Sequence, residues 1–165
     1  MYKRVQKTLF AIRSVLLNSE IVRKLLYNDS NAALSLPAPT LKETKDYITL
    51  QPIYEFGNDT NKKYEQNGMI NIVLEDSEPN EEENSLVGVI RINIVFNVDK
   101  WELLDEKIRP IELSDVVIEL LDNKKFSISN PLSFSGMQPL ILTKQLTGYA
   151  LLFNLTDGSS NLENY

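Results

Sequence analysis

The sequence predicts an α+β fold, in which a mostly antiparallel sheet of about five strands carries N-terminal helices and one inserted helix. Three observations support this prediction. Apolar residues repeat at helical spacing near the N-terminus, alternate with period two in several later segments, and return to helical spacing once between two of those segments.

Length and charge limit the classes of protein to which this chain can belong. Its 165 residues suit one α+β domain, which we expect over residues 1–156, followed by a flexible polar tail over residues 157–165. The net charge of −6 argues against tight, general binding of DNA. No run approaches about 18 consecutive apolar residues, so we expect no membrane span.

Cysteine and histidine are both absent from the sequence. Their absence excludes thiol nucleophiles, Ser-His-Asp triads and zinc sites built on sulfur or nitrogen ligands. No glycine-rich phosphate loop occurs either. We therefore expect no enzymatic activity, no cofactor and no metal site. A carboxylate-based hydrolase is the enzyme class that this composition leaves open.

The N-terminal part is predicted to be helical. Residues 2–17 carry an apolar stripe at helical spacing, and Ser19 is a good N-cap for a short helix over Glu20–Tyr27. After a loop with two prolines, Thr40 can cap another short helix over Leu41–Tyr47. The basic residues of the first helix lie off its stripe and should be solvated or contact an acidic partner: Lys3, Arg4, Lys7 and Arg13.

The sheet is predicted to begin near Ile48. The segment Ile48–Tyr54 contains Pro52, which favours an edge strand or a bulged strand. Met69–Leu74 and Val87–Val95 alternate with period two and are the next strands.

The strand over Val87–Val95 has two different faces. One face carries only apolar residues and should be fully buried: Ile90, Ile92, Ile94 and Phe96. The other face includes Arg91 and Asn93, which we expect to meet water or a partner.

A strongly acidic segment separates these two strands. Residues 75–84 read EDSEPNEEEN, and six of the ten are acidic. Such a block repels itself, so we expect a mobile, solvated loop, and its spacing matches no calcium-binding loop. An electrostatic role in an assembly stays open. The acids are Glu75, Asp76, Glu78, Glu81, Glu82 and Glu83.

A turn at Val98–Lys100 and then Trp101 lead towards the inserted helix. Pro110 suits the first turn of a helix, because its missing N–H needs no partner there. Apolar residues then repeat at helical spacing as far as Leu121. We expect Trp101 to anchor a core or an interface, and Arg109 to join a buried or interfacial salt bridge.

The C-terminal segments are predicted to complete the sheet. Pro131–Met137 alternates, and a short strand over Leu140–Leu142 follows Pro139. Gly148 opens the last strand, which is apolar on both sides and should therefore be central or covered by a helix.

Several features occur in a fixed order in the second half of the chain. An aromatic residue ends a strand, a short acidic stretch with a tryptophan follows, Arg-Pro opens a helix, and a Leu-x-Phe strand precedes a last strand that begins with glycine and an aromatic. These positions are Phe96, Asp99, Trp101, Arg109, Pro110, Leu132, Phe134, Gly148 and Tyr149.

This pattern resembles a family of tailed-bacteriophage proteins of the tail terminator (tail completion) or head–tail joining type. The resemblance covers roughly residues 23–157, with gaps. The sequence differs from the family's pattern in two ways. It lacks the histidine that is frequent near the position of Asp99, and it carries the acidic segment at residues 75–84.

The resemblance implies a structural protein of the virion with a tail-terminator-like fold. Tail terminators form a hexameric ring that caps the tail tube and joins it to the connector, and DNA passes through the lumen without specific binding. It therefore implies a homo-oligomer, with tail tube and neck proteins as partners. It also implies assembly in the cytoplasm of the bacterial host and a final place in the tail or neck.

Two sets of residues are candidates for contacts in such a ring. The interface candidates lie on strand edges, on the second face of the long strand and around the inserted helix: Ile53, Arg91, Asn93, Trp101 and Arg109. The six acids should face either the lumen, where like charge keeps DNA from sticking, or a basic neighbour. The alternatives are another neck component, such as a stopper or tail-tube-like protein, and a small protein-binding module that uses an exposed strand edge.

Overall fold

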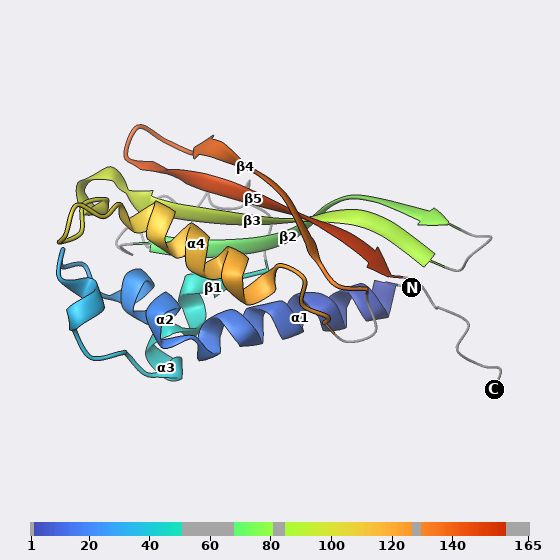
Figure 1. The fold of residues 1–165 in the computed structure, drawn as a ribbon, viewed down its shortest axis with the longest axis horizontal. Helices are drawn as coiled ribbons and strands as arrows, with labels where there is room; N and C mark the ends of the chain where they lie inside the picture. Colours follow the sequence, from blue (N-terminus) through green and yellow to red (C-terminus); the bar gives the residue numbers. More distant parts are fainter. Residues whose placement is uncertain (1, 51–67, 81–84, 127–129, 158–165) are drawn as a thin grey trace.

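A five-stranded mixed sheet with α-helices packed on one of its faces forms the protein (Figure 1). The computed structural model describes residues 2–50, 68–80, 85–126 and 130–157. The predicted α+β class is confirmed, because helices precede the sheet and one helix is inserted between its strands.

The helices begin and end close to the predicted residues. Ser19 Oγ accepts a hydrogen bond from the backbone N–H of Val22, and Thr40 forms a capping box with Glu43. The hydrogen bonds from Thr40 hold the pKa of Glu43 below its usual value. No helix of the described residues is long and apolar enough to cross a membrane. The four helices are α1 (Tyr2–Asn18), α2 (Glu20–Tyr27), α3 (Leu41–Thr44) and α4 (Arg109–Leu121).

The sheet has the strand order β1-β2-β3-β5-β4. The first strand pairs in parallel with the second, and the other three pairings are antiparallel. The last strand therefore lies inside the sheet, as its two apolar sides predicted. The strands are β1 (Ile48–Thr49), β2 (Gly68–Asn80), β3 (Ser85–Asn97), β4 (Ser133–Ile141) and β5 (Leu146–Asp157).

The main core lies between the helices and one face of the sheet. The alternation in β3 is confirmed, since Ile90, Ile92, Ile94 and Phe96 are all fully buried. They meet apolar side chains of α1 and α4. Each such side chain stabilises the fold by roughly 1.5–3 kcal/mol as an upper bound.

The acidic segment differs most from the prediction. Residues 75–80 were expected to form a loop, but they continue β2 and pair with residues 85–89 of β3, with a bulge between Glu75 and Ser77. Backbone hydrogen bonds and an ion pair between Glu75 and Arg91 (3.0 Å) offset the repulsion between the acids. We call residues 75–80 and 85–89 the arm. It projects beyond the helices at the right of Figure 1.

The predicted edge strand is confirmed only in part. Strand β1 lies at the edge of the sheet, but it comprises only Ile48 and Thr49, and Ile53 lies outside the described residues. Arg13, which was expected to be solvated or to contact an acidic partner, is partly exposed and also bonds within the chain. Its guanidinium donates hydrogen bonds to the carbonyls of Ile48 (2.8 Å) and Lys45 (2.6 Å) and so occupies part of the strand's free edge.

Strand β4 forms the other edge of the sheet. The sequence predicted two strands here, over Pro131–Met137 and Leu140–Leu142, but the structure has one. Strand β4 continues through Pro139, which pairs with Tyr149. An edge strand tolerates proline because its outer backbone groups have no strand partner. Strand β5 includes Asp157, the first residue of the predicted tail. Residues 158–165 lie outside the described part of the chain, so the tail stays a prediction.

Candidate functional site

A chain of polar side chains crosses three strands on the sheet face opposite the helices, and we call it the polar ladder. Asn71 Nδ2 donates to Thr49 Oγ1 (3.3 Å), and Asn93 Nδ2 donates to Asn71 Oδ1 (3.1 Å). Arg91 Nε then donates to Asn93 Oδ1 (3.0 Å), and its Nη1 contacts Glu75 Oε1 (3.0 Å). The ladder thus joins β1 to the base of the arm.

Asn93 was expected to contact water or a partner, and the structure shows a different role. Its side chain is fully buried within the chain, so it cannot touch a neighbouring subunit directly. The physical reason is that a buried amide needs a partner, and Asn71 supplies it on the adjacent strand. Arg91 retains 25% exposure of its side chain, so its expected interface role stays a prediction.

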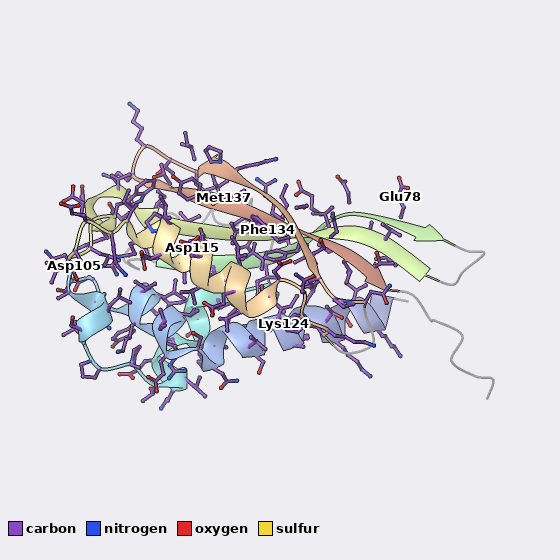
Figure 2. The ribbon with its side chains drawn as sticks, in the orientation of Figure 1. Glu78, Asp105, Asp115, Lys124, Phe134 and Met137 are labelled. Atoms are coloured by element: carbon purple, nitrogen blue, oxygen red, sulfur yellow. The ribbon has the colours of Figure 1, made fainter. Side chains whose placement is uncertain are left out.

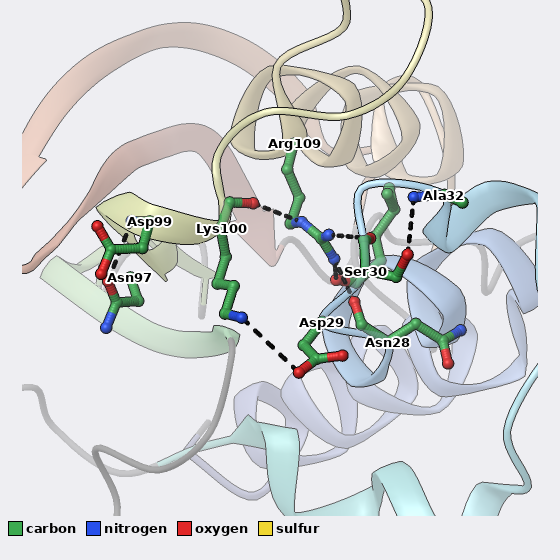
Figure 3. A network of polar contacts seen from close by, with 9 residues as sticks. Asn28, Asp29, Ser30, Ala32, Asn97, Asp99, Lys100 and Arg109 are labelled. Carbon is green, nitrogen blue, oxygen red and sulfur yellow. Dashed lines mark hydrogen bonds and ion pairs between the residues drawn. The ribbon is translucent and has the colours of Figure 1, made fainter.

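Arg109 forms the most densely bonded centre among the described side chains, which we call the Arg109 junction (Figure 3). Its guanidinium donates to the carbonyls of Lys100 (2.7 Å), Leu25 (2.9 Å) and Ser30 (2.6 Å), and also to that of Asn28. These carbonyls belong to the end of α2, the loop after it and the segment before α4. One side chain therefore joins three separate parts of the chain.

The electrostatics of the junction differ from the salt bridge that was expected. Arg109 is fully buried, and the four hydrogen-bond acceptors of its guanidinium are backbone carbonyls. Asp29 instead contacts Lys100 Nζ at 3.7 Å. Burial lowers the pKa of Arg109, and the nearby charge of Asp29 opposes this shift. The carbonyl end of α2 suits a cation, because the helix dipole is negative there. Direct contact with a partner, as expected for Arg109, is excluded by this burial.

Trp101 lies beside the Arg109 junction. Its ring is partly buried against the main core, 6.2 Å from the ring of Tyr149 between centroids. Its carbonyl accepts a hydrogen bond from the backbone N–H of Arg109 (2.7 Å). The indole Nε1 is buried and has no hydrogen-bond partner among the described residues. Trp101 therefore packs within the chain, and contact of its exposed part with a partner stays a prediction.

The unpaired indole nitrogen leads to a test of Trp101. Replacing Trp101 with alanine should lower the free energy of unfolding by about 2 kcal/mol, because packing against the core is lost. Replacing it with phenylalanine keeps an aromatic ring and removes the unpaired N–H, so we expect a loss below about 1 kcal/mol. Urea denaturation of the variants measures both values. Equal losses for the two variants would contradict a packing role.

Three of the six acids that the sequence singled out lie in the described part of the chain, and all three are on the arm. Glu75 is paired with Arg91, whereas Asp76 and Glu78 are exposed (Figure 2 labels Glu78). Asp76 has a positive φ of 44° at the bulge, which redirects the strand. Glu81, Glu82 and Glu83 lie outside the described residues.

Sequence reasoning missed the partners of these candidate residues. The acceptors of Arg109 are backbone carbonyls, for which no side-chain pattern exists. Asn71 was detectable in principle, because a polar residue interrupts the apolar run of its strand. Within the ranges that the structure describes, no group of three or more acidic side chains is placed to hold a metal ion.

Comparison with known proteins supplies one match. A protein-family model described as YomW matches residues 18–155, which contain the polar ladder, the arm and the Arg109 junction. No curated protein matches the chain.

Proposed function

The chain belongs to the YomW family, a family name that points to a phage-associated protein, and from this premise we propose that it is a tail terminator. In this proposal, identical copies form a hexameric ring at the head–tail junction of a tailed bacteriophage. The ring caps the tail tube, joins it to the connector and surrounds the channel for DNA. The chain is then a structural protein without enzymatic activity or cofactor, assembled in the cytoplasm of the bacterial host.

The arm is the observation that carries this proposal. Its two strands extend beyond the helices that cover the rest of the sheet, while Leu86 on the arm is fully buried in the main core. Asp76, Glu78 and Val87 on the arm are exposed. The outer edge of β2 in the arm has no strand partner among the described residues, so main-chain groups and exposed side chains are both available there for contact between subunits.

The remainder of the fold supports a rigid ring subunit. The Arg109 junction and the polar ladder hold the helices and three of the strands in one arrangement. A subunit that must meet two neighbours with the same geometry needs such a fixed shape. The sequence pattern around Phe96, Trp101 and Arg109-Pro110 resembles that of tail terminators and gives independent support.

Native mass spectrometry and negative-stain electron microscopy test the proposal. The purified chain, alone and mixed with the tail tube protein of the same phage, is expected to form rings with a central hole. The tube protein is included because a terminator can need the tube as a template. A chain that stays monomeric in both samples and does not bind tube ends would contradict the proposal. Rings that bind the connector but not the tube would favour another neck component instead.

One observation favours a second candidate, a small protein-binding module. Among the described residues, strand β4 has no strand partner on its outer edge. Met137 (45% exposed) and Ile141 (75% exposed) are apolar side chains on this strand (Figure 2 labels Met137). An extended peptide could pair with such an edge. Pro139 limits the pairing, because it has no N–H to donate. Persistence of the monomer in the experiment above is the result that would favour this candidate.

A further inference from the structure

A basic and apolar groove lies between α1 and α3. It consists of two adjoining hollows of about 510 and 470 Å³, which share Phe10, Arg13 and Lys45. Phe10 is 58% exposed and Leu41 is 49% exposed, so the groove presents two large apolar side chains to solvent. The other side chains used below are Leu17 and Lys42, which line the first hollow.

The charge of this groove is opposite to that of the protein. The chain carries a net charge of −6, yet α1 contains no acidic residue. Lys42 and Lys45 are exposed and take part in none of the ion pairs recorded among the described residues. Asp46 is the one acid among the residues that line the two hollows. Lys3 and Lys7 extend the basic surface along α1.

The arm has the complementary character. Glu75 already pairs with Arg91, but Asp76 and Glu78 are exposed without a recorded ion pair in the described part of the chain. Val87 on the arm is 51% exposed and can contact an apolar surface. Arm and groove thus match in both charge and apolar content.

The arm cannot reach the groove of its own chain. It projects at one end of the molecule's long axis, whereas α3 lies towards the other end (Figure 1). A match between the two surfaces can therefore be realised only between copies.

We propose that the acidic arm of one copy docks into the basic groove between α1 and α3 of a second copy. The two contacting surfaces are different, so the contact is heterologous, and repetition of such a contact closes a ring when the rotation permits. The inference rests on the proposed function, since it names the subunit contact of that ring. It also decides between the two placements of the arm, because Asp76 and Glu78 cannot line the lumen while they are docked.

Charge reversal on each surface tests the contact. The groove variant carries Lys42→Glu and Lys45→Glu. The arm variant carries Glu78→Lys and Asp76→Asn, since asparagine tolerates the positive φ at this position. Each variant alone should associate at least about tenfold more weakly than the wild type.

An equimolar mixture of the two variants is the decisive sample. The acidic groove of one variant then meets the basic arm of the other, and the unchanged arm meets the unchanged groove. We expect association to recover, with the two variants alternating, as measured by native mass spectrometry.

Asp115 and Glu119 on α4 are exposed, so Asp115→Lys with Glu119→Lys is the matched control and should assemble like the wild type. The proposal would be overturned if each variant alone formed rings as the wild type does, or if association did not recover in the mixture. Neither result would contradict ring formation by the wild type.

A crosslinking experiment covers the case in which rings need the tail tube. The chain has no cysteine, so Lys42→Cys with Glu78→Cys introduces one thiol in the groove and one on the arm. Oxidation should link copies into a ladder longer than a dimer, whereas Lys42→Cys with Asp115→Cys should not. Similar ladders from both variants would overturn the docking. A ladder specific to the first variant would support it even if no tail tube is bound, which separates this inference from the proposed function.

Discussion

Replacing Arg109 with alanine is expected to lower the free energy of unfolding by about 4 kcal/mol. The fully buried guanidinium donates to carbonyls of Lys100, Leu25, Asn28 and Ser30, and the substitution leaves these acceptors without their donor. It also removes the contact between the guanidinium and the ring of Phe96, 5.8 Å from the ring centroid. Urea denaturation followed by circular dichroism measures the loss.

Two control variants separate the geometry of the guanidinium from its charge. Arg109→Lys keeps the charge but cannot reach four acceptors with one ammonium group, so we expect an intermediate loss of about 2 kcal/mol. Arg91→Ala removes an arginine whose side chain is 25% exposed, with its ion pair to Glu75 and its hydrogen bond to Asn93, and a loss of about 1 kcal/mol is expected. If Arg109→Ala cost no more than Arg91→Ala, Arg109 would not hold the junction together.

Replacing Gly148 with alanine is the second change with a large expected effect, a loss of about 3 kcal/mol. Gly148 lies in β5, paired with Val95 of β3 on one side and Leu140 of β4 on the other. A Cβ atom here would lie 1.8 Å from the backbone oxygen of Ile94, so the two central strands would have to move apart. Backbone cannot move away as a flexible side chain could, and the pairing of β3 with β5 would weaken.

Gly136 in β4 is the matched control for Gly148. A Cβ atom at Gly136 has nothing within 4 Å, so Gly136→Ala should change the free energy of unfolding by less than about 0.5 kcal/mol. Thermal unfolding of the two variants beside the wild type compares them directly. A loss at Gly148 no larger than that at Gly136 would show that the close approach of β5 to Ile94 is not a constraint.

Local patterns predicted the elements well. The predicted start of α2 was correct because the Ser19 side chain caps the backbone N–H of Val22, three residues further along the chain. The alternation of Ile90, Ile92 and Ile94 correctly predicted the buried face of β3. Such signals act over a few residues, and the sequence contains them in full. Whether the chain is one domain with a flexible tail stays a prediction.

Long-range pairing explains what local patterns got wrong. Six acids among ten residues predicted a loop, but Glu75 forms an ion pair with Arg91 of the neighbouring strand. The strand continues because its backbone groups pair with β3. In the same way, the alternation in β3 predicted that Asn93 faces water or a partner, but its side chain donates a hydrogen bond to Asn71 on the adjacent strand. Propensity is a weak guide where a neighbouring strand supplies the compensating group.

The sequence by itself determined the α+β class, the order of helices and strands, and the membership of the YomW family. Only the tertiary structure decided what the polar residues do. Arg109 is 84 residues from Leu25 along the chain, and the carbonyl that it binds has no sequence signature. The acidic arm and the basic groove were likewise visible as charges in the sequence. Their separate positions, the arm beyond the helices and the groove between α1 and α3, required the fold, and the proposed contact between copies rests on them.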